Sequence, residues 1–282
     1  METNPRNAHK ALSSALARGR GLGEGGFSPW PRAEQDQKTP SPQPSPPNDE
    51  AVSGRGSTNG DALAKILAWT SPSYPTGAFS YSHGLEWAVE AGAVRDVATL
   101  LDYIAAVLAR GGGWIDAVLF ARAYECAHDA AGFDEIADLA AAFRGSAETA
   151  LESTQQGAAF LAVTRKAWPH SMLDTFAERR GDAAVAHSIA MALACAVHGV
   201  PREPALSAWL HATAANLVSA GVRLIPLGQT DGQIATARLA PRIAEIAADA
   251  LATPLEKLGT AAPLLELCSI KHETQYTRLF RS

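Results

Sequence analysis

From residue 61 to the C-terminus, apolar residues recur at the three- and four-residue spacing of an amphipathic α-helix, with no sustained alternation of period two. Leu100, Leu101, Ile104 and Leu108 show this spacing, and glycines and prolines separate one such segment from the next. The expected helices are 62–69, 80–90, 96–110, 114–128, 134–150, 151–168, 182–197, 207–225, 233–250 and 264–272. We therefore predict an all-α fold, a single domain of about nine or ten packed helices.

The first 60 residues have a different composition and hold eight of the 17 prolines and eight of the 23 glycines. The run from Thr39 to Pro47 cannot form a regular hydrogen-bond ladder and prefers extended conformations. Such a segment buries too little surface to offset the entropy lost on ordering. We predict that residues 1–60 form a disordered N-terminal extension and that residues 61–282 form the helical domain.

Net charge and apolar patterning argue against two classes of partner. The formal net charge is −5, the pI is about 5.9, and no basic stripe occurs, which disfavours nucleic-acid binding. The most apolar run, Ile189–Val197, is about half as long as a membrane-spanning helix requires. The basic N-terminus is not followed by the apolar segment of a secretory signal. These features predict a cytoplasmic protein that binds neither nucleic acid nor membrane.

The three cysteines, Cys126, Cys195 and Cys268, are far apart and form no CxxC pair. A disulfide framework or a zinc site is therefore not expected, and a reducing compartment fits this usage. Each thiol is interpreted as a small buried apolar group.

The common catalytic motifs are absent: there is no GxGxxG after a strand, no GxxxxGK[ST], no GxSxG and no HExxH. Two pairs have a spacing that suits metal ligands on a helix, His83 with Glu86 and Glu125 with His128, but neither has an evident third ligand. We interpret both pairs as structural or surface residues. A helical metal-binding carrier, or a helical enzyme that uses His83 and Glu86, remains the alternative.

Two segments are unusual for a connector and a chain end. Residues 71–86 place prolines, glycines, serines and three aromatic side chains in a loop that leads into a helix. This loop either packs on the core or forms a contact surface. Residues 271–282 carry Tyr276, Leu279 and Phe280 next to Arg278 and Arg281, and Tyr and Arg are enriched in interfaces. A Leu-Phe tip requires a groove, on this chain or on a partner, and the tail is expected to order on docking.

These segments, with motifs between them, resemble the UreF family of urease accessory proteins. The matching residues are Ser71-Pro72, Pro75-x-Gly77-x-Phe-Ser-Tyr-Ser82-x-Gly-Leu-Glu86, Val89-Glu90-x-Gly92-x-Val94, Arg144-x-Ser-x-Glu148, Glu152-x-x-x-Gln156-Gly157, Ser219-Ala-Gly-Val-Arg223, Ile225-Pro-Leu-Gly-Gln229-x-x-Gly-Gln233 and His272-Glu-x-Gln-Tyr-x-Arg-Leu-Phe-Arg-Ser282. They follow the order of the family over residues 61–282. Departures are Glu266 before the tail, Thr277 where serine is common, and the N-terminal extension, which has no counterpart.

The resemblance implies an all-α homodimer with a non-enzymatic role in the maturation of urease, a nickel enzyme. It implies binding to the accessory protein UreD, called UreH in some organisms, and through it to the GTPase UreG and to apo-urease. No cofactor would be bound directly, because nickel is handled by the complex and GTP is bound by the UreG-type partner.

The resemblance also assigns candidate site residues. The tail would dock against the UreD/UreH-type partner through His272, Glu273, Gln275, Tyr276, Arg278, Leu279, Phe280, Arg281 and Ser282. The surface presented to UreD and UreG would be shaped by Pro72, Pro75, Gly77, Phe79, Ser80, Tyr81, Gly84, Glu86, Arg223 and Gln229. No catalytic and no metal-ligating residue is expected.

Overall fold

The structure, a computed structural model, describes residues 59–282. The chain divides by its contacts into Met1–Ala51 and Val52–Ser282, and only the second unit contains described residues. The prediction of a disordered extension over residues 1–60 therefore falls almost entirely outside the part that the structure describes.

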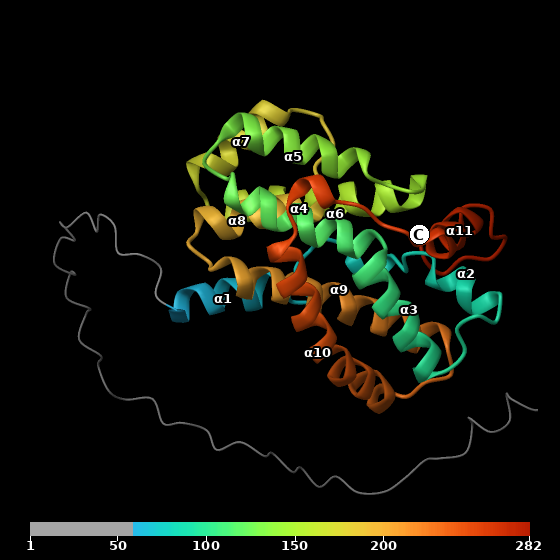
Figure 1. The fold of residues 1–282 in the computed structure, drawn as a ribbon. Helices are drawn as coiled ribbons and strands as arrows, with labels where there is room; N and C mark the ends of the chain where they lie inside the picture. The colour runs from blue at the N-terminus through green and yellow to red at the C-terminus, as the bar shows by residue number, and fades with distance from the viewer. Residues whose placement is uncertain (1–58) are drawn as a thin grey trace, which may run out of the picture. The chain divides into compact units, whose positions relative to one another are not determined.

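Residues 59–282 form helices and no strands, which confirms the prediction of an all-α fold (Figure 1). The helices are α1 (Asn59–Trp69), α2 (Leu85–Glu90), α3 (Val97–Arg110), α4 (Gly112–Glu125), α5 (Ala130–Ala142), α6 (Ala147–Ala167), α7 (Ser171–Arg180), α8 (His187–Val197), α9 (Arg202–Leu224), α10 (Gln229–Ala252) and α11 (Pro263–His272). Two short 3-10 helices, η2 (Ala78–Ser80) and η3 (Leu255–Lys257), lie in connecting segments.

The predicted helix 134–150 is wrong, because the chain leaves the helical conformation between Ala142 and Ala147. Ser146 begins α6 as an N-cap, and its side chain and that of Thr149 each bond to the other's backbone N–H. Sequence analysis also missed α7, a short helix that begins after His170, whose ring accepts a hydrogen bond from the N–H of Met172.

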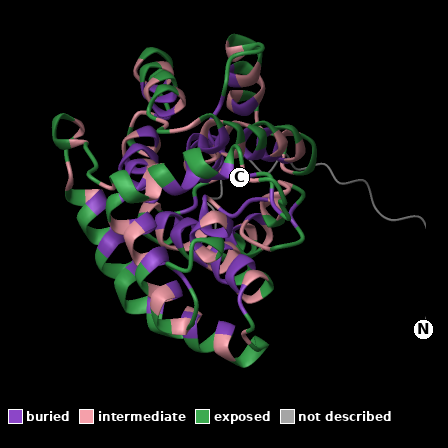
Figure 2. Ribbon diagram, turned by 90° about the vertical axis from the view of Figure 1, so that its right-hand side faces the viewer, coloured by how far each residue is buried: buried purple, intermediate pink, exposed green. Residues whose placement is uncertain are grey.

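Helix α8 lies at the centre of the domain and packs against α4, α6 and α9. All residues from Ser188 to Cys195 are buried, and three of them are alanines, which allow neighbouring helices to approach closely. Figure 2 shows the same arrangement, with buried stripes facing inwards and exposed faces outwards. The most apolar run of the sequence is therefore the core of the domain.

One stretch of the described residues, Val97–Glu125, is long and apolar enough to cross a membrane by length and composition, with a mean hydropathy of 1.5. It consists of two helices, α3 and α4, which are separated at Gly111. Of its most apolar part, 67% is buried inside the domain, so packing against other helices accounts for its composition.

The backbones of α6 and the segment before α8 are in close contact at Gly157. A Cβ atom at this position would lie 2.0 Å from the carbonyl oxygen of Val185 and 2.9 Å from the amide nitrogen of His187. Both neighbours are backbone atoms, which cannot move away without shifting a helix.

We predict that Gly157→Ala lowers the free energy of unfolding by about 1–3 kcal/mol, although alanine is the better helix former, because the added methyl group meets the backbone. Urea unfolding followed by circular dichroism measures the change. Gly259→Ala is the control, since nothing lies within 4 Å of a Cβ there, and its effect should stay within about 0.5 kcal/mol. Equal stabilities of the two variants would contradict the close contact.

Candidate functional site

The two segments that sequence analysis singled out separately, residues 71–86 and the tail, lie side by side. Helix α11 packs against α2, next to the C-terminus (Figure 1). The amide of Arg281 donates to the carbonyl of Ser80 at 2.8 Å, and the amide of Ser82 donates to the carbonyl of Ser282, also at 2.8 Å. The tail is therefore held along the loop that precedes α2.

Glu86 connects the tail to the body of the domain. Its carboxylate is buried and accepts hydrogen bonds from the amides of Leu279, at 2.6 Å, and Phe280, at 2.9 Å. The Nε2 atom of His272 lies 3.0 Å from the same carboxylate. A buried carboxylate is tolerated only when hydrogen bonds and opposite charge replace its hydration, and the tail supplies both.

His272 is 0% exposed and lies between two carboxylates. Its Nδ1 atom is 2.7 Å from Glu148, while its Nε2 atom faces Glu86. Both hydrogen bonds to ionised carboxylates form only when both ring nitrogens carry a proton. Arg278 places a guanidinium group 2.9 Å from Glu148. We call Glu86, Glu148, His272 and Arg278 the clamp.

Glu152 forms a second connection between tail and body. It accepts a hydrogen bond from the hydroxyl of Ser282 at 2.9 Å and lies 3.3 Å from Nδ1 of His83. Burial disfavours the charge on His83, but Glu152, with Glu266 and Asp116, outweighs it and raises the pKa of the imidazole.

Arginines cover the aromatic side chains of the two segments. The guanidinium of Arg223 lies 4.3 Å from the ring centroid of Phe280 and donates to the carbonyl of Phe79 at 2.8 Å. Arg281 lies over the ring of Tyr81 at 5.7 Å. These cation–π contacts add a modest attraction between α9, the loop and the tail.

Helix α11 is itself fixed against α2 and α6. Gly84 has a φ of +75°, a conformation that favours glycine, and a Cβ there would lie 2.7 Å from the amide nitrogen of Ser269. The hydroxyls of Ser269 and Ser146 are hydrogen-bonded at 2.7 Å, and Glu273 accepts from the first amide of α6, that of Ala147, at 3.1 Å.

The exposure of the tail corrects part of the sequence prediction. Tyr276 is fully exposed and Leu279 is 64% exposed, but Phe280 is 3% exposed. The sequence predicts that the Leu-Phe tip needs a groove on this chain or on a partner: Phe280 is buried against its own chain, whereas Leu279 stays exposed. His272 and Ser282 are buried as well. Docking of the tail to a partner stays a prediction, and the exposed residues of the tail would have to make the contacts with that partner.

The residues predicted to shape a partner surface divide into two groups. One group is buried in contact with α11 or the tail and can shape the surface only by supporting it; it consists of Tyr81, Gly84 and Glu86. Phe79 is exposed, as are Pro72 and Pro75, whereas Gly77 and Ser80 are half-buried. Gln229, the first residue of α10, is exposed and forms no hydrogen bond with the tail among the described residues.

The pairs considered as metal ligands do not form sites. His83 pairs with Glu152, whereas Glu86 pairs with His272, so the two side chains face different partners. His83 has a φ of +56°, and this turn of the backbone separates it from the helix that holds Glu86. Glu125 pairs with Arg122 and Arg202. Over residues 59–282, no three histidine, cysteine, aspartate or glutamate side chains are grouped as a metal site.

A buried ion pair beneath this surface was missed by sequence reasoning. Arg144 donates two hydrogen bonds of 2.8 Å to Asp116, which also accepts from Ser188 at 2.6 Å. Burial raises the pKa of Asp116, but Arg144 more than reverses this and the pKa lies below its usual value. The partners come from α4, α8 and the α5–α6 connection, so no local pattern indicates them.

Comparison with known proteins decides the family. The family model described as UreF matches residues 94–240. The urease accessory protein UreF of Granulibacter bethesdensis is 52% identical over 228 residues, 80% of this chain and 96% of that protein. The chain belongs to the UreF family. The UreF proteins of Rhodopseudomonas palustris (strain TIE-1) and Bradyrhizobium diazoefficiens are 48% and 45% identical over 223 residues, 78% of this chain and 92% of each relative.

Membership of the UreF family assigns an accessory role in urease maturation. These relatives are named as accessory proteins and not as enzymes, which confirms the prediction of a non-enzymatic protein. The clamp is thus a structural feature of an accessory protein, and its residues hold a surface in place.

We predict that Glu86→Gln in this UreF-family protein lowers the free energy of unfolding by about 1–3 kcal/mol, because the NH₂ group of the glutamine amide cannot accept the hydrogen bonds that the carboxylate oxygen receives. Urea unfolding measures this, and trypsin should cleave faster at Arg278 and Arg281. Glu135→Gln, at an exposed position of α5, is the control and should change stability by less than about 0.5 kcal/mol. Equal trypsin resistance in both variants would contradict the role of Glu86.

The pH dependence of stability provides a second test of the buried polar groups. Burial lowers the pKa of His187 from 6.5 to about 4, against the opposing effect of Asp116 and Glu152. Between these two pH values the unfolded chain takes up a proton that the folded chain does not. We predict that stability falls by up to about 1.4 kcal/mol per pH unit from this group as the pH is lowered.

His187→Phe should reduce this slope, measured by urea unfolding across the same pH range. Subtracting the curve of the variant from that of the natural sequence removes the contribution of the other titrating groups. Identical slopes would show that His187 is not held neutral by burial.

Proposed function

We propose that this UreF-family protein is a scaffold that binds a UreD/UreH-type protein through the exposed residues of its tail. Through that complex it engages a UreG-type GTPase and apo-urease, so that nickel is inserted into the apo-enzyme. In this proposal the chain itself binds no cofactor, since nickel is handled by the assembled complex and GTP is bound by the partner. A homodimer in the cytoplasm belongs to the same proposal.

The observation that supports this proposal is the clamp. Glu86 and Glu148 hold His272, the amides of Leu279 and Phe280, and Arg278, which leaves Tyr276 and the side chain of Leu279 at the surface. A surface that is already ordered loses less entropy on binding than a flexible segment would. The tail therefore offers an aromatic and an aliphatic anchor in a defined position.

The apolar face of α11 extends this surface. Leu264, Leu267 and Ile270 lie exposed at three-residue spacing, on one side of the helix that leads into the tail. Isolated exposed apolar side chains are common, but a contiguous group is typical of a protein-binding site. We propose that this face and the tail contact the UreD/UreH-type partner together.

A separate surface is proposed for the assembly with the GTPase. Phe79 is 67% exposed, and its carbonyl is held by Arg223, which also stacks on the buried Phe280. This contact connects the loop of residues 71–86 to the tail. Binding at one surface can therefore stabilise the other without a large conformational change.

We predict that Leu279→Ser, alone or with Tyr276→Ala, weakens binding to the UreD/UreH-type protein at least about tenfold, because both side chains are exposed in the free chain and would act as anchors. Co-purification and calorimetric titration with the partner measure the loss. Circular dichroism and urea unfolding should be unchanged, which separates the loss of binding from a loss of fold.

Leu67→Ser is the matched control, because Leu67 is 63% exposed against 64% for Leu279 and lies on α1. Its binding to the partner should equal that of the natural sequence. If Leu279→Ser binds as tightly as Leu67→Ser, the tail is not the docking surface.

A further inference from the structure

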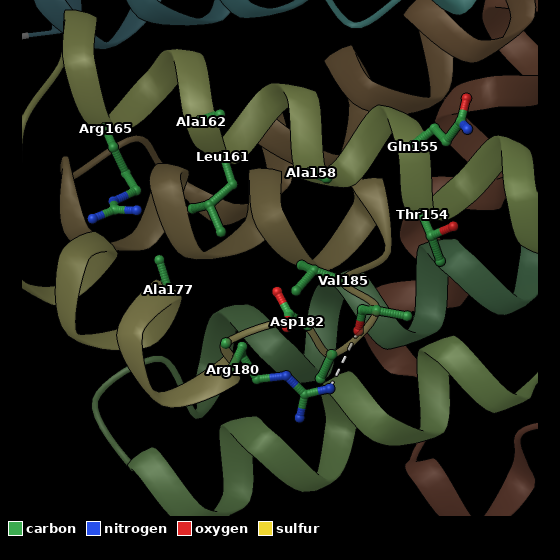
Figure 3. Close-up of a pocket in the computed structure, with 13 residues that line it drawn as sticks. Thr154, Gln155, Ala158, Leu161, Ala162, Arg165, Ala177, Arg180, Asp182 and Val185 are labelled. Carbon is green, nitrogen blue, oxygen red and sulfur yellow. Dashed lines mark hydrogen bonds between the residues drawn. The ribbon is translucent and has the colours of Figure 1, made fainter.

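Two hollows open on the surface of the described domain, and they differ in their polar groups. The first, of about 460 Å³, is a groove between α6 and α7 (Figure 3). Its arginines already have partners: Arg180 bonds to Asp138 and to the carbonyl of Ala184, and Arg165 bonds to Asp174. The arginines of the groove are therefore already paired, and its other charged side chain, Asp182, is exposed.

The second hollow is a cavity of about 380 Å³ beneath the loop of residues 70–79, bounded by α6, α8 and α9. Its walls include aromatic side chains, among them Trp69, Tyr74, Phe79 and Trp209. Its floor is polar and carries His83, Glu152, His187 and the buried ion pair described above. It has room for much more than a single water molecule, which occupies about 30 Å³ in the liquid.

His187 leaves a hydrogen-bond donor without a partner in this cavity. The indole N–H of Trp209 donates to Nδ1 of His187 at 3.4 Å. Indole nitrogen is only a donor, so Nδ1 is the acceptor and the ring proton of the neutral imidazole lies on Nε2. That Nε2 atom is buried and has no hydrogen-bond partner among the described residues. Such a group requires an acceptor oxygen from a molecule in the cavity.

An acceptor is also available on the floor of the cavity. Oε2 of Glu152 is engaged by His83 and Ser282, but Oε1 accepts no hydrogen bond from any described residue. Glu152 lies close enough to His187 to act on it electrostatically. The cavity thus pairs a free N–H donor with a free carboxylate oxygen.

The charges of the floor balance without a ligand. Arg144 is neutralised by Asp116, and His83 pairs with Glu152. An anion in the cavity would be repelled by two carboxylates and would find no positive charge that is not already paired. A cation would be repelled by Arg144 and His83. A neutral molecule with one acceptor, one donor and an apolar body matches these groups.

We propose that this cavity binds a small neutral amide, whose carbonyl oxygen accepts the Nε2–H of His187 and whose N–H donates to Glu152. The aromatic walls cover the apolar part of the ligand. None of the exposed tail residues lines this site, although Phe79 of the surface proposed for the GTPase does. Ligand binding in the cavity can be tested on the full chain alone.

Benzamide and its isosteric anion benzoate are the probes that test this proposal. Nitrogen-15 NMR of the histidine side chains should show His187 protonated at Nε2. Benzamide should shift the Nε2 resonance of His187 in a saturable titration, and benzoate should bind at least about tenfold more weakly. His187→Phe should weaken benzamide binding about tenfold or more, whereas His128→Phe, at an exposed position away from the cavity, should not alter it.

Three results would overturn the proposal. The first is the absence of any benzamide-dependent shift of His187 up to the solubility limit, which would leave only water in the cavity. The second is benzoate binding as tightly as benzamide. The third is benzamide binding that His187→Phe leaves unchanged. Because the titration reads His187 in the natural sequence, the test holds even if His187→Phe does not fold.

Discussion

The arrangement of the candidate site depends on one buried carboxylate. Glu86 is 7% exposed, and a negative charge in such a place is stable only with opposite charge and several hydrogen-bond donors around it. Its donors are His272 and the amides of Leu279 and Phe280, which lie more than 180 residues away in the sequence. Removing any of these groups would leave charge uncompensated inside the protein. The same interaction therefore positions α2, α11 and the tail together.

This constraint explains how a protein of the UreF family can present a chain end as a rigid surface. The buried side of the tail, His272 and Phe280, contacts the domain, while Tyr276 and Leu279 face solvent. Arg223 contacts both the tail and the carbonyl of Phe79, so the loop and the tail share one support. An accessory protein acts through its surfaces, and here the two surfaces proposed for partners are held by a common set of buried polar contacts.

The sequence predicted a helix closely where apolar periodicity and a flanking glycine agreed, as for α3, but it placed the start of α9 at residue 207 because Pro204, which lies in the first turn of α9, was taken to precede the helix. It failed at Arg144–Ser146, although Gly145 and the capping residue Ser146 mark the break there, and at α7, which is short. It also identified both the loop and the tail as unusual. It could not show that they meet, because the pairing of Glu86 with His272 and the burial of Phe280 arise from long-range packing. The left-handed backbone at His83, which separates it from Glu86, has no signal in a non-glycine residue.

The most direct test is hydrogen exchange at the backbone amides of the tail in the isolated full-length chain. If Glu86 holds the tail, the amides of Leu279 and Phe280 should exchange slowly, at rates near those of α11, and exposed neighbours without such a bond should exchange fast. Protection of these two amides should disappear in Glu86→Gln. Exchange of Leu279 and Phe280 at the rate of an unstructured peptide in the natural sequence would contradict the account.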